Sequence, residues 1–223
     1  MTAEEIRKKI KDIRSSLPAE VIVEAAVKGR LVQEIETAIE SGIDIIGENY
    51  VQEALIHKQA IKKKASRWHF IGRLQKNKIN KAILLFDMIE TLSSWDLAVA
   101  LNERLKKTRK RIDVLVEVNI AREPQKNGVF PEETETFVKK LSLLGNIQVK
   151  GLMTMGPNLE KEEMRPYFRN MRQIFERIRK LSLEGVKMEY LSMGMSSSFK
   201  VAVEEGANLV RLGRAIFGPR PDY

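Results

Sequence analysis

The sequence of 223 residues contains no cysteine and only two histidines, His57 and His69. Without cysteine there is no disulfide scaffold, thiol nucleophile or zinc–thiolate site. Two histidines are too few for a histidine-rich metal site, so we expect no metal. No apolar run approaches the roughly 18 residues that span a bilayer. The first ten residues, MTAEEIRKKI, lack the apolar segment of a secretory signal. These absences predict a cytoplasmic globular protein with no membrane segment.

Positive charge exceeds negative charge, with 39 Lys and Arg against 30 Asp and Glu, a net charge of +9. Such a balance raises the possibility of an anionic partner such as nucleic acid. The strongest basic runs, 62–64 and 104–111, each end a helical stretch and precede a strand. Basic side chains there complement the negative ends of helices, so we favour solvated helix ends. The sequence matches no nucleic-acid-binding motif and lacks the interleaved aromatic residues used for base stacking.

The sequence has no linker rich in glycine, serine or proline, which predicts a single domain over residues 1–223. Thr2 and Glu5 have the spacing of a capping box, and Ile6, Ile10 and Ile13 then repeat at helical spacing. This pattern predicts an extra N-terminal helix within residues 1–20. Short β-branched runs then alternate with helical patterns, and the predicted strands cover 21–27, 43–47, 67–72, 86–92, 113–119, 148–155, 188–193 and 209–213.

Regular alternation of strands and helices implies parallel strands joined by crossover helices. Eight such units in this length fit a compact (β/α)8 TIM barrel, which takes about 200 to 250 residues. An open, doubly wound α/β sheet is the alternative. A barrel builds its site from the loops at the C-terminal ends of its strands. Polar residues and glycine occur at nearly every predicted strand end, including Asn49, His69, Asn119, Met153 with Thr154, Ser192 and Arg211.

Lys28 directly follows an apolar strand, which places its amine at the barrel mouth, where an amine can attack an aldehyde. The loops after strands seven and eight are the common phosphate site of this fold. There, Ser196 supplies a hydroxyl at the start of the next helical pattern, and Gly213 and Arg214 supply backbone N–H groups. An amine and an anion site across one mouth suit a ligand with an aldehyde and a phosphate. Pyridoxal 5′-phosphate has this shape.

Five collinear motifs resemble the pyridoxal phosphate homeostasis protein family, whose members bind pyridoxal phosphate and are related to the barrel domain of alanine racemase (fold type III). The motifs are GENYVQEA (47–54), WHFIGRLQKNK (68–78), GLMTM (151–155), LSMGMSSSF (191–199) and VRLGRAIFG (210–218). The resemblance extends from about residue 20 to residue 218. It implies intracellular homeostasis of pyridoxal phosphate, with PLP-dependent apoenzymes as potential recipients, and we expect a monomer.

The resemblance also implies roles for individual residues. It assigns the internal aldimine to Lys28, the contact with the pyridine nitrogen to Arg211, and the phosphate contacts to Ser196, Gly213 and Arg214. The further cofactor contacts that we expect are Asn49, His69, Met153 and Ser192. The sequence departs from the family pattern at four positions: Val27, Gly29 and Leu31 stand where Ser, Thr and Pro are usual, and Arg214 stands where Thr is usual.

Three functions compete: a binding protein without robust catalysis, a PLP-dependent amino-acid racemase, and a basic nucleic-acid or interaction module. Arg211 is always cationic and favours an unprotonated pyridine nitrogen, which weakens the ring as an electron sink. Racemases of this fold share that arginine. They also use an opposing tyrosine from an added β-domain and the partner subunit, which we do not expect here, since the sequence ends at Tyr223. We therefore favour the binding protein.

Overall fold

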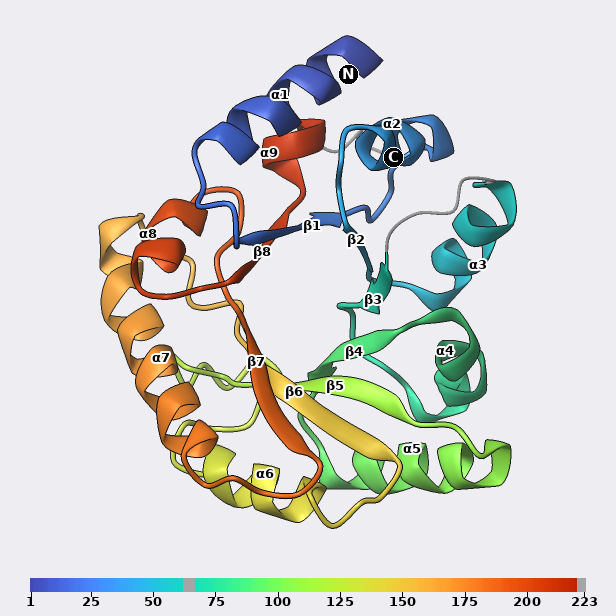
Figure 1. The fold of residues 1–223 in the computed structure, drawn as a ribbon, viewed down its shortest axis with the longest axis vertical. Coiled ribbons are helices and arrows are strands. Elements are labelled where there is room, and N and C mark those ends of the chain that lie inside the picture. The colour runs from blue at the N-terminus through green and yellow to red at the C-terminus, as the bar shows by residue number, and fades with distance from the viewer. Residues whose placement is uncertain (62–66, 220–223) are drawn as a thin grey trace.

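A computed structural model describes residues 1–61 and 67–219, which form one closed barrel of parallel strands inside a ring of helices (Figure 1). The basic run at 62–64 lies outside the described residues. Each strand pairs with its neighbour in sequence, and β8 closes the barrel against β1. The closed barrel confirms the predicted fold and excludes the open sheet. Its strands are β1 Ile22–Ala26, β2 Ile45–Glu48, β3 Arg67–Phe70, β4 Met88–Leu92, β5 Ile112–Glu117, β6 Ile147–Met153, β7 Val186–Ser192 and β8 Leu209–Leu212.

The helices cover the outside of the barrel, and they begin largely where sequence signals place them. They are α1 Ala3–Ser15, α2 Val32–Glu40, α3 Val51–Ala60, α4 Ile79–Leu85, α5 Trp95–Thr108, α6 Thr134–Leu141, α7 Arg165–Arg179, α8 Phe199–Glu204 and α9 Arg214–Phe217, with short 3-10 helices η1 Lys76–Lys78 and η2 Glu162–Met164. The capping box of Thr2 and Glu5 is present at α1. This extra helix lies beside α2 and α9 (Figure 1).

Two helix boundaries differ from the sequence prediction. The repeat of Phe137, Leu141 and Leu144 suggests a helix up to Gly145, but α6 ends at Leu141. Leu144 packs against the core from the turn beyond the helix, so its apolar character reflects packing and not helical conformation. Likewise, Ser196 does not begin a helix, because α8 starts at Phe199. No helix among the described residues is long and apolar enough to cross a membrane.

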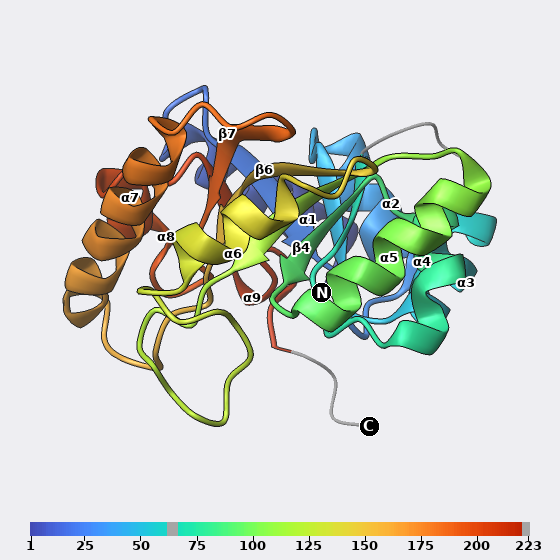
Figure 2. The same ribbon diagram turned by 90° about the horizontal axis from the view of Figure 1, so that it is seen from below.

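Side chains alternate along each strand between the barrel interior and the layer beneath the helices. On β1, Val23 and Ala25 belong to the core under the helices, whereas Glu24 points inward and lies near His69 of β3. The interior-facing series of β1 leads through Ala26 to Lys28. The loops that follow the strands form the mouth, and the long β5–α6 loop projects beyond the strands at that end, in yellow-green (Figure 2). The alternation therefore determines which side chains reach the mouth.

Candidate functional site

Lys28 lies in the turn directly after β1 and is half-buried at the barrel mouth, as the sequence predicts. The turn reverses at Gly29, whose φ is +65°. The Lys28 Nζ atom lies 4.9 Å from the ring centroid of Tyr50, which follows β2. The Lys28 amine is therefore at an entrance bordered by an aromatic ring, where a ligand can reach it.

Arg211 of β8 is buried beneath this mouth and is held by Ser192 of β7 and by Thr154, which directly follows β6. Its Nη1 atom donates to the Ser192 hydroxyl at 2.5 Å, and its Nη2 atom donates to the Thr154 carbonyl oxygen at 2.8 Å. The Ser192 hydroxyl in turn donates to Glu90 Oε2 at 2.8 Å. These contacts bring together Arg211 and Ser192, which the sequence analysis proposes as parts of one site.

A cluster of fully buried ionisable groups fills the interior below Arg211. His69 Nδ1 lies 2.7 Å from Glu90 Oε1 and 3.8 Å from Glu24 Oε1, and all three side chains are inaccessible to solvent. Burial, followed by the nearby Glu90 charge, raises the pKa of Glu24 well above its usual range. Burial is the largest influence on Glu90 and acts to raise its pKa, but the hydrogen bond and charge of His69, the charge of Arg211 and the hydrogen bond from Ser192 together lower the pKa.

The two pKa values therefore shift in opposite directions, so that Glu24 favours its protonated form and Glu90 its ionised form. The nearby charge of Arg211 acts to lower the pKa of both carboxyl groups. The donor atoms of Glu24, His69 and Glu90 lie within 4.8 Å of one another, a spacing that also suits a metal ion. The sequence analysis, which expects no metal, does not foresee this cluster. His69 Nε2 has no hydrogen-bond partner among the described residues.

The predicted phosphate residues meet where β7 and β8 end. The Ser196 hydroxyl accepts a hydrogen bond from the Ala215 backbone N–H at 3.0 Å, so the loop after β7 contacts the first turn of α9. Gly213 precedes this helix, and a side chain there would come within 3.3 Å of the Ala26 carbonyl oxygen. Arg214 is exposed. The structure thus brings Ser196, Gly213 and Arg214 to one corner of the mouth, next to β1.

The two other predicted contacts lie apart from this corner. Met153 is buried within the barrel, where it packs with Met88 and Leu115. Asn49 is half-buried after β2 and borders a pocket of about 420 Å³ on the far side of Tyr50. The barrel mouth therefore has two flanks, with the phosphate residues beside β8 and an open pocket beside β2 and β3.

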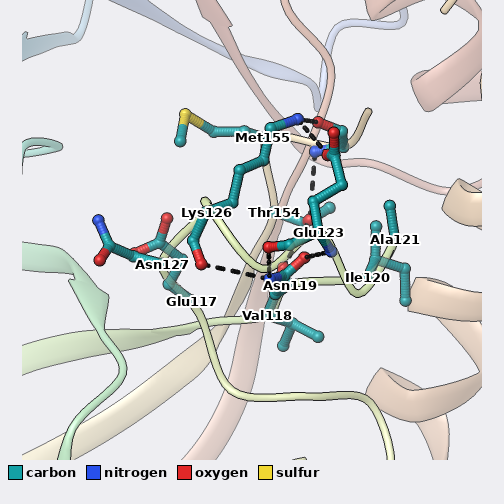
Figure 3. A pocket seen from close by; sticks show the side chains of 11 residues that line it. Glu117, Val118, Asn119, Ile120, Ala121, Glu123, Lys126, Asn127, Thr154 and Met155 are labelled. Carbon is teal, nitrogen blue, oxygen red and sulfur yellow. Dashed lines mark hydrogen bonds and ion pairs between the residues drawn. The ribbon is translucent and has the colours of Figure 1, made fainter. Parts of the chain in front are cut away.

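A second cavity, of about 10 Å³, lies at the end of β5 and has room for about one water molecule (Figure 3). Asn119 organises its loop, because its Nδ2 atom donates to the Glu123 carbonyl oxygen at 2.8 Å and its Oδ1 atom accepts from the Glu123 N–H at 3.0 Å. Lys126 donates to the Gly156 carbonyl oxygen at 2.7 Å and ties this loop to the next. Asn119 therefore has a structural role.

Glu117 borders the same cavity and is a site residue that the sequence analysis misses. It is 4% exposed at the end of β5. Burial raises its pKa to about 7, against the opposing charges of Arg211 and Arg73. The signal in the sequence is an acidic residue inside the apolar run DVLVEVN, and Glu24 and Glu90 interrupt apolar strands in the same way.

Comparisons with known proteins agree with this fold. The family model of the alanine racemase N-terminal domain matches residues 2–221. An alanine racemase from Clostridium difficile 630 superposes with a TM-score of 0.82 over 98% of this chain and 58% of its own, at 16% identity, which shows a shared fold. The protein is therefore an alanine-racemase-type barrel.

Closer relatives define the family more narrowly. A pyridoxal phosphate homeostasis protein of Aquifex aeolicus is 42% identical over 180 residues, which is 80% of this chain and 78% of the relative. The Escherichia coli K12 protein of the same name is 33% identical over 92% of this chain and 88% of its own. PipY of Synechococcus elongatus PCC7942, solved with pyridoxal phosphate bound, superposes with a TM-score of 0.87 over 96% of this chain and all of its own, at 30% identity. This chain belongs to the pyridoxal phosphate homeostasis protein family.

Proposed function

We propose that this protein binds pyridoxal 5′-phosphate covalently through Lys28 and takes part in the homeostasis of this cofactor, without robust catalysis of its own. The observation that carries the proposal is the barrel mouth, where the Lys28 amine follows β1, Gly213 follows the neighbouring β8, and Ser196 of the loop after β7 contacts the helix that begins after Gly213. Pyridoxal phosphate supplies an aldehyde that condenses with amines and a ring that can act as an electron sink. The names of the relatives and the ligand of PipY support the same function.

The side chains of the mouth fit such a ligand. Ser196 and the backbone at Gly213 and Arg214 would hold the phosphate, with room for close approach because Gly213 has no side chain. Arg211 would lie against the pyridine nitrogen. Asn49, His69, Met153 and Ser192 would complete the surroundings of the ring, and the unpartnered His69 Nε2 is a buried polar atom that a ligand or water would satisfy.

The charge of Arg211 bears on what the bound ring can do, although racemases of this fold share this arginine and it does not by itself separate a carrier from a racemase. A guanidinium stays charged at any physiological pH, and the contacts from Ser192 and Thr154 hold it in place. Its charge opposes protonation of the ring nitrogen, and an unprotonated ring is a weaker electron sink. We propose that the protein keeps the reactive aldehyde bound and passes it to PLP-dependent apoenzymes, acting in the cytoplasm as a monomer and without a nucleic-acid partner.

Borohydride reduction tests the proposal. Incubation with pyridoxal phosphate and borohydride, followed by peptide mapping, should place the pyridoxyl group on Lys28. Lys28→Ala should lose the label and keep its circular dichroism spectrum. Lys76→Ala, which removes an exposed lysine paired with Asp96 at 3.3 Å, is the matched control and should keep the label. A label on another lysine contradicts the assignment.

A racemase is the competing function, because alanine racemases share the fold. Enantiomers of alanine, serine, lysine and glutamate should show no turnover within the usual enzyme range of about 1–10³ s⁻¹. Sustained racemisation in that range, abolished by Lys28→Ala, would replace the carrier by an enzyme.

A further inference from the structure

The pocket of about 420 Å³ beside the mouth shares one lining residue, Asn49, with the cofactor site as proposed, and its other lining residues have no role there. It lies between the β2–α3 loop and the segment from β3 to η1. Its volume falls in the range of about 300–1,000 Å³ that is typical of small-molecule sites. Most of its lining comes from the motifs GENYVQEA and WHFIGRLQKNK, of which the cofactor site uses only Asn49 and His69.

Two of the lining residues, Arg73 and Lys78, are cations. The side chains of Arg73 and Lys78 form no hydrogen bond or ion pair with the residues that the structure describes. Lys76, in the same segment, differs because it pairs with Asp96 at 3.3 Å and does not line the pocket. Arg73 also acts electrostatically on Glu117 of the barrel mouth. Two cations that form no ion pair within residues 1–61 and 67–219 line one pocket, which favours an anionic ligand. A guanidinium suits a carboxylate.

The rest of the pocket is not built for a bare anion. Val51, Phe70 and Leu74 are buried side chains that supply an apolar wall, and the partly exposed Tyr50 ring forms one border. Inorganic phosphate would leave this wall without a contact, whereas an organic acid with an apolar body would cover it. Because the Tyr50 ring lies 4.9 Å from Lys28 Nζ, the pocket adjoins the reactive amine.

We propose that this pocket binds the carboxylate of an amino acid with an apolar side chain, with Arg73 and Lys78 as its counter-ions. The amine of this ligand would point past Tyr50 toward Lys28. The direction of the amine rests on the proposed function, whereas the carboxylate site stands on the pocket alone. The amine of the bound amino acid would then lie next to the cofactor that Lys28 holds.

Titration of the cofactor-free protein tests the carboxylate site, followed by calorimetry and by the amide NMR signals of Val51 and Gly72. L-Phenylalanine should bind and L-phenylalaninamide, which lacks the carboxylate, should bind at least about tenfold more weakly, as expected for the loss of a charge-assisted contact. Arg73→Gln and Lys78→Gln should each weaken phenylalanine by about five- to tenfold. Lys76→Gln removes the same charge from a paired lysine and should leave binding unchanged.

Several results would overturn the proposal. If L-phenylalaninamide binds as tightly as L-phenylalanine, the pocket does not recognise the carboxylate. If Lys76→Gln weakens binding as much as Arg73→Gln and Lys78→Gln do, the effect comes from the overall positive charge and not from a specific site. Binding of inorganic phosphate at this pocket, with no binding of phenylalanine, indicates a different ligand. If Arg73→Gln weakens pyridoxal phosphate but not pyridoxal, the pocket is the phosphate site of the cofactor. The titration uses cofactor-free protein, so its result does not depend on whether Lys28 is labelled by pyridoxal phosphate. The carboxylate site and the proposed function can therefore fail separately.

Discussion

The ionisation of Glu117 links the stability of the barrel to pH. Burial raises the pKa of this carboxyl from 4.5 to about 7 in the folded protein. Since the folded state binds its proton more tightly than the unfolded state, this group contributes stability that is fully present below about pH 4.5 and is lost as pH rises through about 7. The difference between these two pKa values corresponds to roughly 3 to 4 kcal/mol of unfolding free energy at about 1.4 kcal/mol per pKa unit.

The substitution Glu117→Gln removes this dependence, because an amide does not ionise. In urea unfolding, the variant should match the native protein near pH 5 within about 1 kcal/mol and exceed it near pH 8.5 by roughly 3 kcal/mol. Glu20→Gln, at an exposed position, is the control and should leave the difference between the two pH values unchanged. Parallel pH profiles for Glu117→Gln and the native protein would refute the reasoning.

Two further substitutions test the phosphate corner and the barrel backbone. In a fluorescence titration, Ser196→Ala should lower the affinity for pyridoxal phosphate about tenfold and leave the affinity for pyridoxal unchanged. Ser197→Ala, at an exposed neighbouring position, is the control and should change neither affinity. Equal losses of affinity for both ligands would place the phosphate elsewhere. Gly151→Ala puts a Cβ atom 1.9 Å from the Tyr190 carbonyl oxygen, at a φ of +150°. This substitution should destabilise the fold by about 3 kcal/mol or more in thermal unfolding. Gly145→Ala, where the added Cβ atom meets nothing within 4 Å, is the control and should have a small effect. Equal melting temperatures for the two variants would contradict the clash.

The barrel could be predicted because its strands and helices have different periods in the sequence. All eight predicted strands overlap observed ones, and the cap at Ser94, whose hydroxyl accepts from the Leu97 N–H, marks the start of α5. Helix ends are less certain from periodicity, because apolar residues also pack from turns. Leu17 and Leu144 contact the core from beyond α1 and α6, so the apolar repeat extends past the helices themselves.

The outline of the site also follows from topology. Parallel strands of a barrel end at one face, so Lys28, Ser192 and Arg211 could be placed at one mouth without coordinates. The ionisable interior could not, because Glu24 and Glu90 lie within strands that are not adjacent in the barrel. Their meeting depends on the stagger between strands, which no local pattern records. An acidic residue inside an apolar strand marks each position but does not identify its partner.

This interior explains how the barrel presents Arg211. A continuous series of contacts runs from His69 through Glu90 and Ser192 to the guanidinium, with separations of 2.7, 2.8 and 2.5 Å. Rotation of Arg211 would leave Ser192 and the Thr154 carbonyl without their donor in a buried site, at about 1–3 kcal/mol for each unsatisfied group. The guanidinium is therefore fixed before any ligand arrives. A ligand group that meets this fixed cation would gain affinity from preorganisation, because the guanidinium does not have to be ordered on binding.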